Sequence, residues 1–173
     1  MKRAGKLLVV VDMQHDFIDG ALGTPEARRI LPRVTERVCA ARLNGETVVF
    51  TRDTHEEDYL STQEGERLPV VHCVRGTRGW QLAEGLAAEG ERVFDKPAFG
   101  STELAKFAAE GAFAEAELIG VCTDICVISN ALLLKAFAPE LRVSVRADCC
   151  AGATPAGHET ALAAMRACQV DIV

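Results

Sequence analysis

The sequence lacks long apolar runs, blocks of basic residues and low-complexity segments. None of its apolar runs reaches the roughly 18 residues that a transmembrane helix needs, which argues against a membrane protein. The net charge of −6 comes without a basic block, which argues against nucleic acid and anionic membrane as partners. Because no repeat or linker divides the 173 residues, we expect a single domain over 1–173.

Paired cysteine motifs are also missing. The seven cysteines are an odd number at irregular spacings without a CxxC pair, which favours a reducing compartment and mostly structural thiols. The N-terminal segment has basic residues before an apolar stretch, as a signal peptide does. That stretch ends at Asp12 without a small-residue cleavage site, so we interpret it as a buried first strand. A cytoplasmic protein is expected, and a homo-oligomer stays open.

Short apolar runs alternate with helical patterns. Strands are expected at 6–11, 47–51, 92–94, 117–121, 141–145 and 170–173, and helices at 32–43, 77–88, 101–109, 127–137 and 154–168. Continuous apolar strands separated by helices are typical of parallel sheets covered on both faces. The pattern therefore predicts an α/β fold, a three-layer Rossmann-like arrangement in which helices cover both faces of a six-stranded, mostly parallel sheet.

Four reactive side chains follow the expected strands. Asp12 ends the first strand, Asp53 follows the second, Lys96 the third and Cys126 the fourth. Ligand sites of open parallel sheets lie beyond the carboxyl ends of the strands, so these side chains should meet on one rim. Taken singly, each has a structural explanation: a helix cap, a solvated lysine or a core thiol. Together they favour a functional site.

Cys126 lies in the sequence GVCTDICV at 120–127, between an apolar strand and a helix. Unpaired backbone N–H groups and the positive end of a helix dipole favour the thiolate form of cysteine, which is the nucleophile. A nearby lysine lowers the pKa of a thiol, and an aspartate can carry protons to and from it. The combination predicts a hydrolase with a cysteine nucleophile.

A second group of residues lies in a polar segment at 51–74. It holds Asp53, His55, Glu64 and His72, and a polar loop of about 20 residues is unusual without a function. Two imidazoles and two carboxylates suit a divalent ion such as Zn²⁺, Mn²⁺ or Fe²⁺. Single histidines are more often structural, so the spacing alone leaves a metal site and a structural cluster equally open.

Five motifs resemble those of the isochorismatase-like cysteine hydrolases, and among them the nicotinamidases. They are VVVDMQHDF at 9–17, FTRDTH at 50–55, HCVRGTRGW at 72–80, DKPAFGS at 95–101 and GVCTDICV at 120–127. The resemblance covers nearly the whole chain, with the motifs in the family's order. It implies that Cys126 is the nucleophile, Asp12 the general acid and base, and Lys96 the residue that supports both.

The resemblance also implies the surroundings of these residues. Asp53, His55, Glu64 and His72 match the metal ligands of the nicotinamidases, with zinc expected first and manganese or iron as alternatives. A non-proline cis peptide is implied between Val121 and Cys122, with the backbone N–H groups of Cys122 and Cys126 as the oxyanion hole. Phe17 corresponds to an aromatic wall of the substrate pocket.

The implied reaction is hydrolysis of nicotinamide to nicotinate and ammonia through a thioester, with the metal orienting the pyridine ring, as a step of NAD salvage. One departure concerns the tryptophan that many nicotinamidases carry before the last metal histidine. Here 68–71 is Leu-Pro-Val-Val, so Phe99 becomes a candidate wall, whereas Trp80 is expected to anchor a helix start. Two alternatives stay open: a related cysteine amidase for a carbamoyl or ureido compound, and a non-catalytic binding module.

Overall fold

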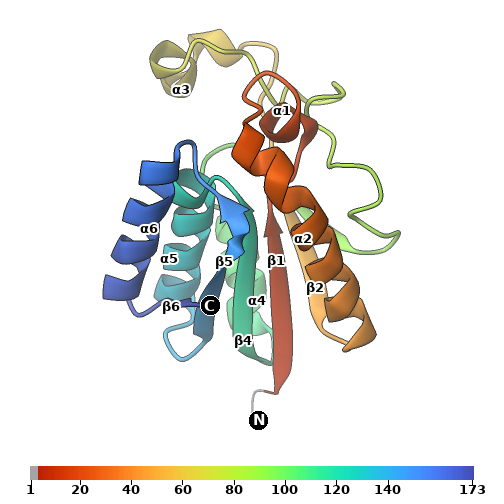
Figure 1. The fold of residues 1–173 in the computed structure, drawn as a ribbon, viewed down its shortest axis with the longest axis vertical. Helices are drawn as coiled ribbons and strands as arrows, with labels where there is room; N and C mark the ends of the chain where they lie inside the picture. Colours follow the sequence, from red (N-terminus) through yellow and green to blue (C-terminus); the bar gives the residue numbers. More distant parts are fainter. Residues whose placement is uncertain (1–3) are drawn as a thin grey trace.

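Six parallel strands form one sheet in the computed structural model, which describes residues 4–173 (Figure 1). They are β1 (Gly5–Val11), β2 (Thr47–Asp53), β3 (Arg92–Lys96), β4 (Phe113–Val121), β5 (Arg142–Ala151) and β6 (Asp171–Ile172). Their order is β3-β2-β1-β4-β5-β6, and each neighbouring pair runs parallel. The expected fold class is confirmed. Residues 1–3, which the expected domain includes, lie outside the described part of the chain.

Helices cover both faces of this sheet. They are α1 (His15–Ile18), α2 (Pro25–Leu43), α3 (Gln63–Arg67), α4 (Thr102–Glu110), α5 (Ile128–Phe137) and α6 (Pro155–Ala167), with a 3-10 turn η1 (Tyr59–Ser61) and a π-helical turn η2 (Thr123–Val127). The α3 segment lies beyond the carboxyl ends of the strands (Figure 1). None of the helices in residues 4–173 combines the length and the apolar character that a membrane crossing requires.

The two layers of core follow from the alternation of side chains along β1. Leu7, Val9 and Val11 pack into one buried cluster, to which α4, α5 and α6 contribute. Leu8 and Val10 point to the opposite face and pack with residues of α2. Successive side chains of a strand face opposite sides of a sheet, so a continuous apolar run is what a strand buried on both faces requires.

The helix expected at 77–88 is wrong, because this segment is a series of turns. Gly76 and Gly85 take positive φ values of 83° and 76°, which break a helix. The backbone of the segment bonds to distant residues instead: the N–H of Ala83 donates to the carbonyl of Met13, at 2.8 Å. Trp80 therefore anchors no helix start.

The first long helix begins seven residues before the expected 32, at Pro25. Thr24 caps it by accepting a hydrogen bond from the N–H of Ala27 at 3.0 Å, and proline takes the first helical position. The same Thr-Pro pair starts α6 at Thr154 and Pro155, where the sequence pattern predicted it.

Candidate active site and metal centre

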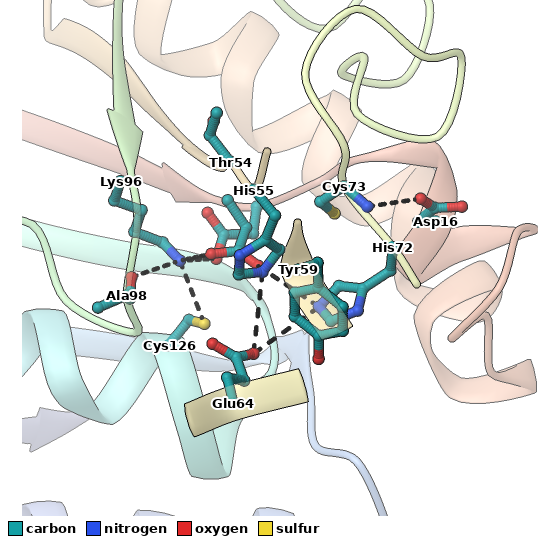
Figure 2. Close-up of polar contacts among 12 residues, drawn as sticks. Asp16, Thr54, His55, Tyr59, Glu64, His72, Cys73, Lys96, Ala98 and Cys126 are labelled. Carbon is teal, nitrogen blue, oxygen red and sulfur yellow. Dashed lines mark hydrogen bonds and ion pairs between the residues drawn. The ribbon is translucent and has the colours of Figure 1, made fainter. Parts of the chain in front are cut away.

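Lys96 connects the side chains that follow the strands. Its Nζ lies 2.7 Å from Asp12 Oδ2 and 3.0 Å from Asp53 Oδ1. It also lies 3.4 Å from Cys126 Sγ (Figure 2). Lys96 and Asp12 are fully buried, with exposed fractions of 1% and 0%. Asp12 directly follows β1, Asp53 and Lys96 are the last residues of β2 and β3, and Cys126 lies in η2. The four side chains therefore meet at one rim of the sheet, as the sequence predicts.

The close approach of β4 to β1 brings Cys126 to this rim. Gly120 on β4 has a φ of 117°, and a Cβ atom there would lie 2.1 Å from the backbone oxygen of Val11 on β1. Only glycine fits this position, because both its φ and the contact exclude a side chain. The peptide bond between Val121 and Cys122 is cis, as the resemblance implies.

The charges at this rim differ from the sequence expectation in one respect. Burial raises the pKa of the Cys126 thiol well above its usual value, Asp12 raises it further, and the opposing effect of Lys96 does not compensate. Burial also raises the pKa of Asp12, against the attraction of Lys96. For Lys96, burial opposes the charge, but Asp12 and the neighbouring acidic groups hold its pKa well above normal. The resting site thus favours a protonated thiol, where the sequence suggested a thiolate.

The two carboxylate oxygens of Asp12 have different partners. Its Oδ1 accepts a hydrogen bond from the hydroxyl of Thr51 at 2.6 Å. Its Oδ2 faces the Lys96 ammonium and receives no aligned hydrogen bond from other side chains of residues 4–173. Its 2.7 Å contact with Lys96 is therefore the interaction that protonation of this oxygen would weaken.

Four potential metal ligands lie beside the buried lysine: Asp53, His55, Glu64 and His72. One ligand atom from each lies within 4.8 Å of all the others. His55 Nε2 is 3.0 Å from Asp53 Oδ2, and Glu64 Oε1 is 3.8 Å from the Nε2 atoms of both imidazoles (Figure 2). Glu64 reaches the cluster from α3, while Asp53 comes from the end of β2.

Neighbouring groups orient these ligands. His72 Nδ1 donates to the carbonyl of Val70 at 2.7 Å, which leaves Nε2 free to bind a metal. The ring of Tyr59, with 0% exposure, packs against both imidazoles, with centroid distances of 4.6 Å and 4.9 Å. Two imidazoles and two carboxylates directed into one buried space fit a borderline divalent ion such as zinc.

Charge interactions within the cluster also suit a cation. Burial by itself raises the pKa of Asp53, but the close imidazoles of His55 and His72 and the positive charge of Lys96 outweigh it and hold that pKa well below the usual range. Burial raises the pKa of Glu64, and the neighbouring carboxylate of Asp53 adds to this effect. Two carboxylates so close together repel each other, and a divalent ion between them would remove that repulsion.

A cavity of about 790 Å³ connects the thiol with this cluster. Phe17 and Phe99, the two expected substrate-binding residues, both line it. Phe17 packs edge-on against His72 with a centroid distance of 5.7 Å, whereas Phe99 is 46% exposed at the mouth. Trp80 is not among the lining residues in 4–173, and its indole N–H donates to the hydroxyl of Thr54 at 2.8 Å.

Two residues near the metal cluster escaped the sequence patterns. The side chain of Gln14 donates to the carbonyl of Asp53 at 2.9 Å and accepts from its N–H at 2.7 Å. Asp16 Oδ2 accepts from the N–H of Cys73 at 2.7 Å, next to His72 (Figure 2). Both lie in the motif VVVDMQHDF, but only long-range backbone contacts reveal what they do.

The Isochorismatase domain model matches residues 6–173. The chain belongs to the isochorismatase family. It is 32% identical to the pyrazinamidase of Pyrococcus horikoshii, crystallised in complex with zinc, with a TM-score of 0.87 over 98% of this chain and 99% of that chain. It is 28% identical to the nicotinamidase/pyrazinamidase of Mycobacterium tuberculosis over 97% of this chain and 98% of the relative, and 25% identical to the nicotinamidase of Saccharomyces cerevisiae over 73% and 80%. The expected enzyme class, a nicotinamidase-like hydrolase, is confirmed.

Proposed function

We propose that this hydrolase is a metal-dependent cysteine amidase that converts nicotinamide to nicotinate and ammonia, as a cytoplasmic step of NAD salvage. The observation that carries the proposal is the shared cavity, which joins the Cys126 thiol to four potential metal ligands. The similarity to nicotinamidases and pyrazinamidases supports the same substrate class.

The first half of the proposed reaction forms a thioester. Asp12 Oδ2 accepts the proton of the Cys126 thiol, while the Lys96 ammonium, 3.4 Å from the sulfur, stabilises the thiolate as it forms. The sulfur attacks the carboxamide carbon. Backbone N–H groups of Cys122 and Cys126 donate to the resulting oxyanion, a contribution of roughly 3–4 kcal/mol per donor in comparable sites. Asp12 then gives its proton to the leaving nitrogen, the C–N bond breaks and ammonia departs.

The second half returns the enzyme to its starting state. Asp12 takes a proton from a water molecule, whose oxygen attacks the thioester carbon. The C–S bond breaks, the acid is released and the Cys126 sulfur recovers its proton from Asp12. In both halves, one negative charge moves between Asp12, the Cys126 sulfur and the oxyanion. The buried Lys96 ammonium stays beside these groups and balances that charge.

Asp53, His55, Glu64 and His72 would hold the metal, with zinc as the first candidate and manganese or iron as alternatives. When bound, the ion would supply a Lewis acid for the pyridine nitrogen, which orients the ring. Phe17, which lines the cavity and packs against His72, would contact one face of that ring. Phe99 at the mouth is the second candidate for a ring contact.

A second candidate function is hydrolysis of another small amide, such as a carbamoyl or ureido compound. It is favoured by the residues before His72, because none of residues 68–71 is aromatic and none can stack on a pyridine ring. Val71 among them is 50% exposed. The non-catalytic alternative is disfavoured because a protein that only binds needs no buried lysine against a buried thiol.

Ammonia release from nicotinamide by the metal-loaded protein tests the proposal. We expect turnover that a chelator abolishes and that Cys126→Ala removes, while Cys39→Ala retains it, because Cys39 is an exposed thiol that does not line the cavity. Turnover by Cys126→Ala at the rate of the control would reject the cysteine mechanism. Turnover of a ureido compound but not of nicotinamide would favour the second candidate.

A further inference from the structure

The cavity is much larger than the substrate proposed for it. A ring of nicotinamide's size has the bulk of about five water molecules, at about 30 Å³ each, whereas the cavity measures about 790 Å³. That volume lies within the range of about 300–1,000 Å³ that pockets for drug-sized ligands have. A ring held between the thiol and the metal cluster would leave most of the cavity vacant.

The lining of the cavity has two parts. The floor consists of buried residues, among them Asp53, His72 and Cys126, with exposed fractions of 3%, 3% and 5%. The rim of the cavity consists of exposed residues and is distinct from the sheet rim that carries Lys96. By the rim we mean, in this subsection, Gln63, Arg67, Leu68 and Phe99. Leu68 and Phe99 add apolar surface to the rim, with 37% and 46% of each residue open to solvent.

Arg67 gives the rim its charge. Among the lining side chains that the structure describes, it is the one with a permanent positive charge, and no ion pair within residues 4–173 neutralises it. Residues three apart on a helix lie on the same side, so Arg67 follows Glu64 by one turn of α3. Glu64 itself lies 3.8 Å from both imidazoles. Arg67 and Glu64 line the same cavity.

We propose that the rim is a second subsite, in which Arg67 binds an anionic group of aromatic carboxamides larger than nicotinamide. Leu68 and Phe99 would contact the apolar part of such a substrate. The inference rests on the proposed function, because a larger substrate would extend along the cavity from a carboxamide at Cys126 and a ring at the metal cluster. The chemistry stays the same: water and the carboxamide give ammonia and the corresponding acid.

Two probes of nearly equal size test this subsite, 5-carboxynicotinamide with its anion and 5-acetylnicotinamide without one. For each we would measure ammonia release by the metal-loaded wild type, Arg67→Gln and Arg29→Gln. Arg29 is an exposed arginine of α2 that does not line the cavity, so its variant has the same change of net charge. We expect Arg67→Gln to lower the ratio of kcat/KM for the acid over the ketone by about 2- to 5-fold, as loss of an exposed ion pair would. Arg29→Gln should leave the ratio unchanged.

Equal ratios in all three proteins would overturn the inference while leaving nicotinamide hydrolysis intact. Should nicotinamide itself, assayed alongside the probes, release no ammonia, the proposed function fails, and the binding of both probes to metal-loaded Cys126→Ala, with and without Arg67→Gln, decides the subsite separately. A preference for the acid that Arg67→Gln removes would support the subsite in that case too. The same affinity for both probes would reject it. Added salt should weaken the preference, because it screens exposed charges.

Discussion

Replacing Asp16 by alanine tests how the chain holds the metal ligand His72 in place. The carboxylate of Asp16 accepts two backbone hydrogen bonds, from Cys73 at 2.7 Å and from Ala21 at 3.2 Å. It thereby joins the segment after α1 to the segment that carries His72. Cys73 has a φ of 48°, an unfavourable value for a residue with a side chain, so this backbone depends on its anchor.

The expected loss of stability in Asp16→Ala depends on whether water can reach the two backbone N–H groups that lose their acceptor. Cys73 has 0% exposure, and an unpaired buried N–H costs about 1–3 kcal/mol. Ala21 is exposed, so water replaces the second hydrogen bond at little cost. We expect Asp16→Ala to lower the free energy of unfolding by about 2 kcal/mol, which for a chain of this length lowers the Tm by roughly 4–8 °C.

Zinc affinity should fall with stability. Partners that orient metal ligands typically contribute about 10- to 100-fold to metal affinity, and Asp16 acts one residue further from the metal, so we expect about a 10-fold loss. Urea unfolding and competition with a chromophoric chelator would measure the two effects. The matched control is Asp19→Ala, because Asp19 is an exposed carboxylate that pairs with His15 and Arg78. An Asp16→Ala protein as stable as this control, with wild-type zinc affinity, would refute the reasoning.

Three further predictions concern stability. Burial raises the pKa of Glu117, but hydrogen bonds from Arg146 and Arg37 outweigh it and lower that pKa. Stability from Glu117 is therefore present above the unfolded pKa of about 4.3 and is lost as the pH falls through the folded value. In urea, the difference between wild type and Glu117→Gln should shrink below about pH 4, and a constant difference would contradict this. Gly120→Ala should lower the free energy of unfolding by about 3 kcal/mol or more, since the new Cβ would clash with a backbone oxygen of β1. In Gly45→Ala the new Cβ contacts no atom, so the loss should be about 1–2 kcal/mol for the φ of 68° alone. Similar melting temperatures for the two variants would contradict the packing argument. Chelator should lower the Tm of metal-loaded protein and leave metal-free protein unchanged, because an ion that binds only the folded state stabilises it; identical curves would argue against a metal site.

The pattern of apolar runs predicts the sheet and the places where reactive side chains leave it. Apolar runs of strand length predict buried strands because a strand inside a parallel sheet buries both faces. The residue type at the end of each run then marks the rim, which is how Asp12, Lys96 and Cys126 could be identified. The strand boundaries differ from the prediction: β5 continues to Ala151, well past the apolar run at 141–145, because its last residues pair with β4.

Other properties depend on residues far apart in the chain and become visible only in the folded protein. Glycine φ values and backbone bonds to β1 residues replace the helix expected at 77–88. The raised pKa of Cys126 follows mainly from burial, which a helix-dipole argument from the sequence does not include. The role of Asp16 became visible with Cys73, 57 positions away. Local sequence patterns show which residues of an element are buried and where the element ends. Desolvation and long-range hydrogen bonds arise only when the order of the strands brings those ends together.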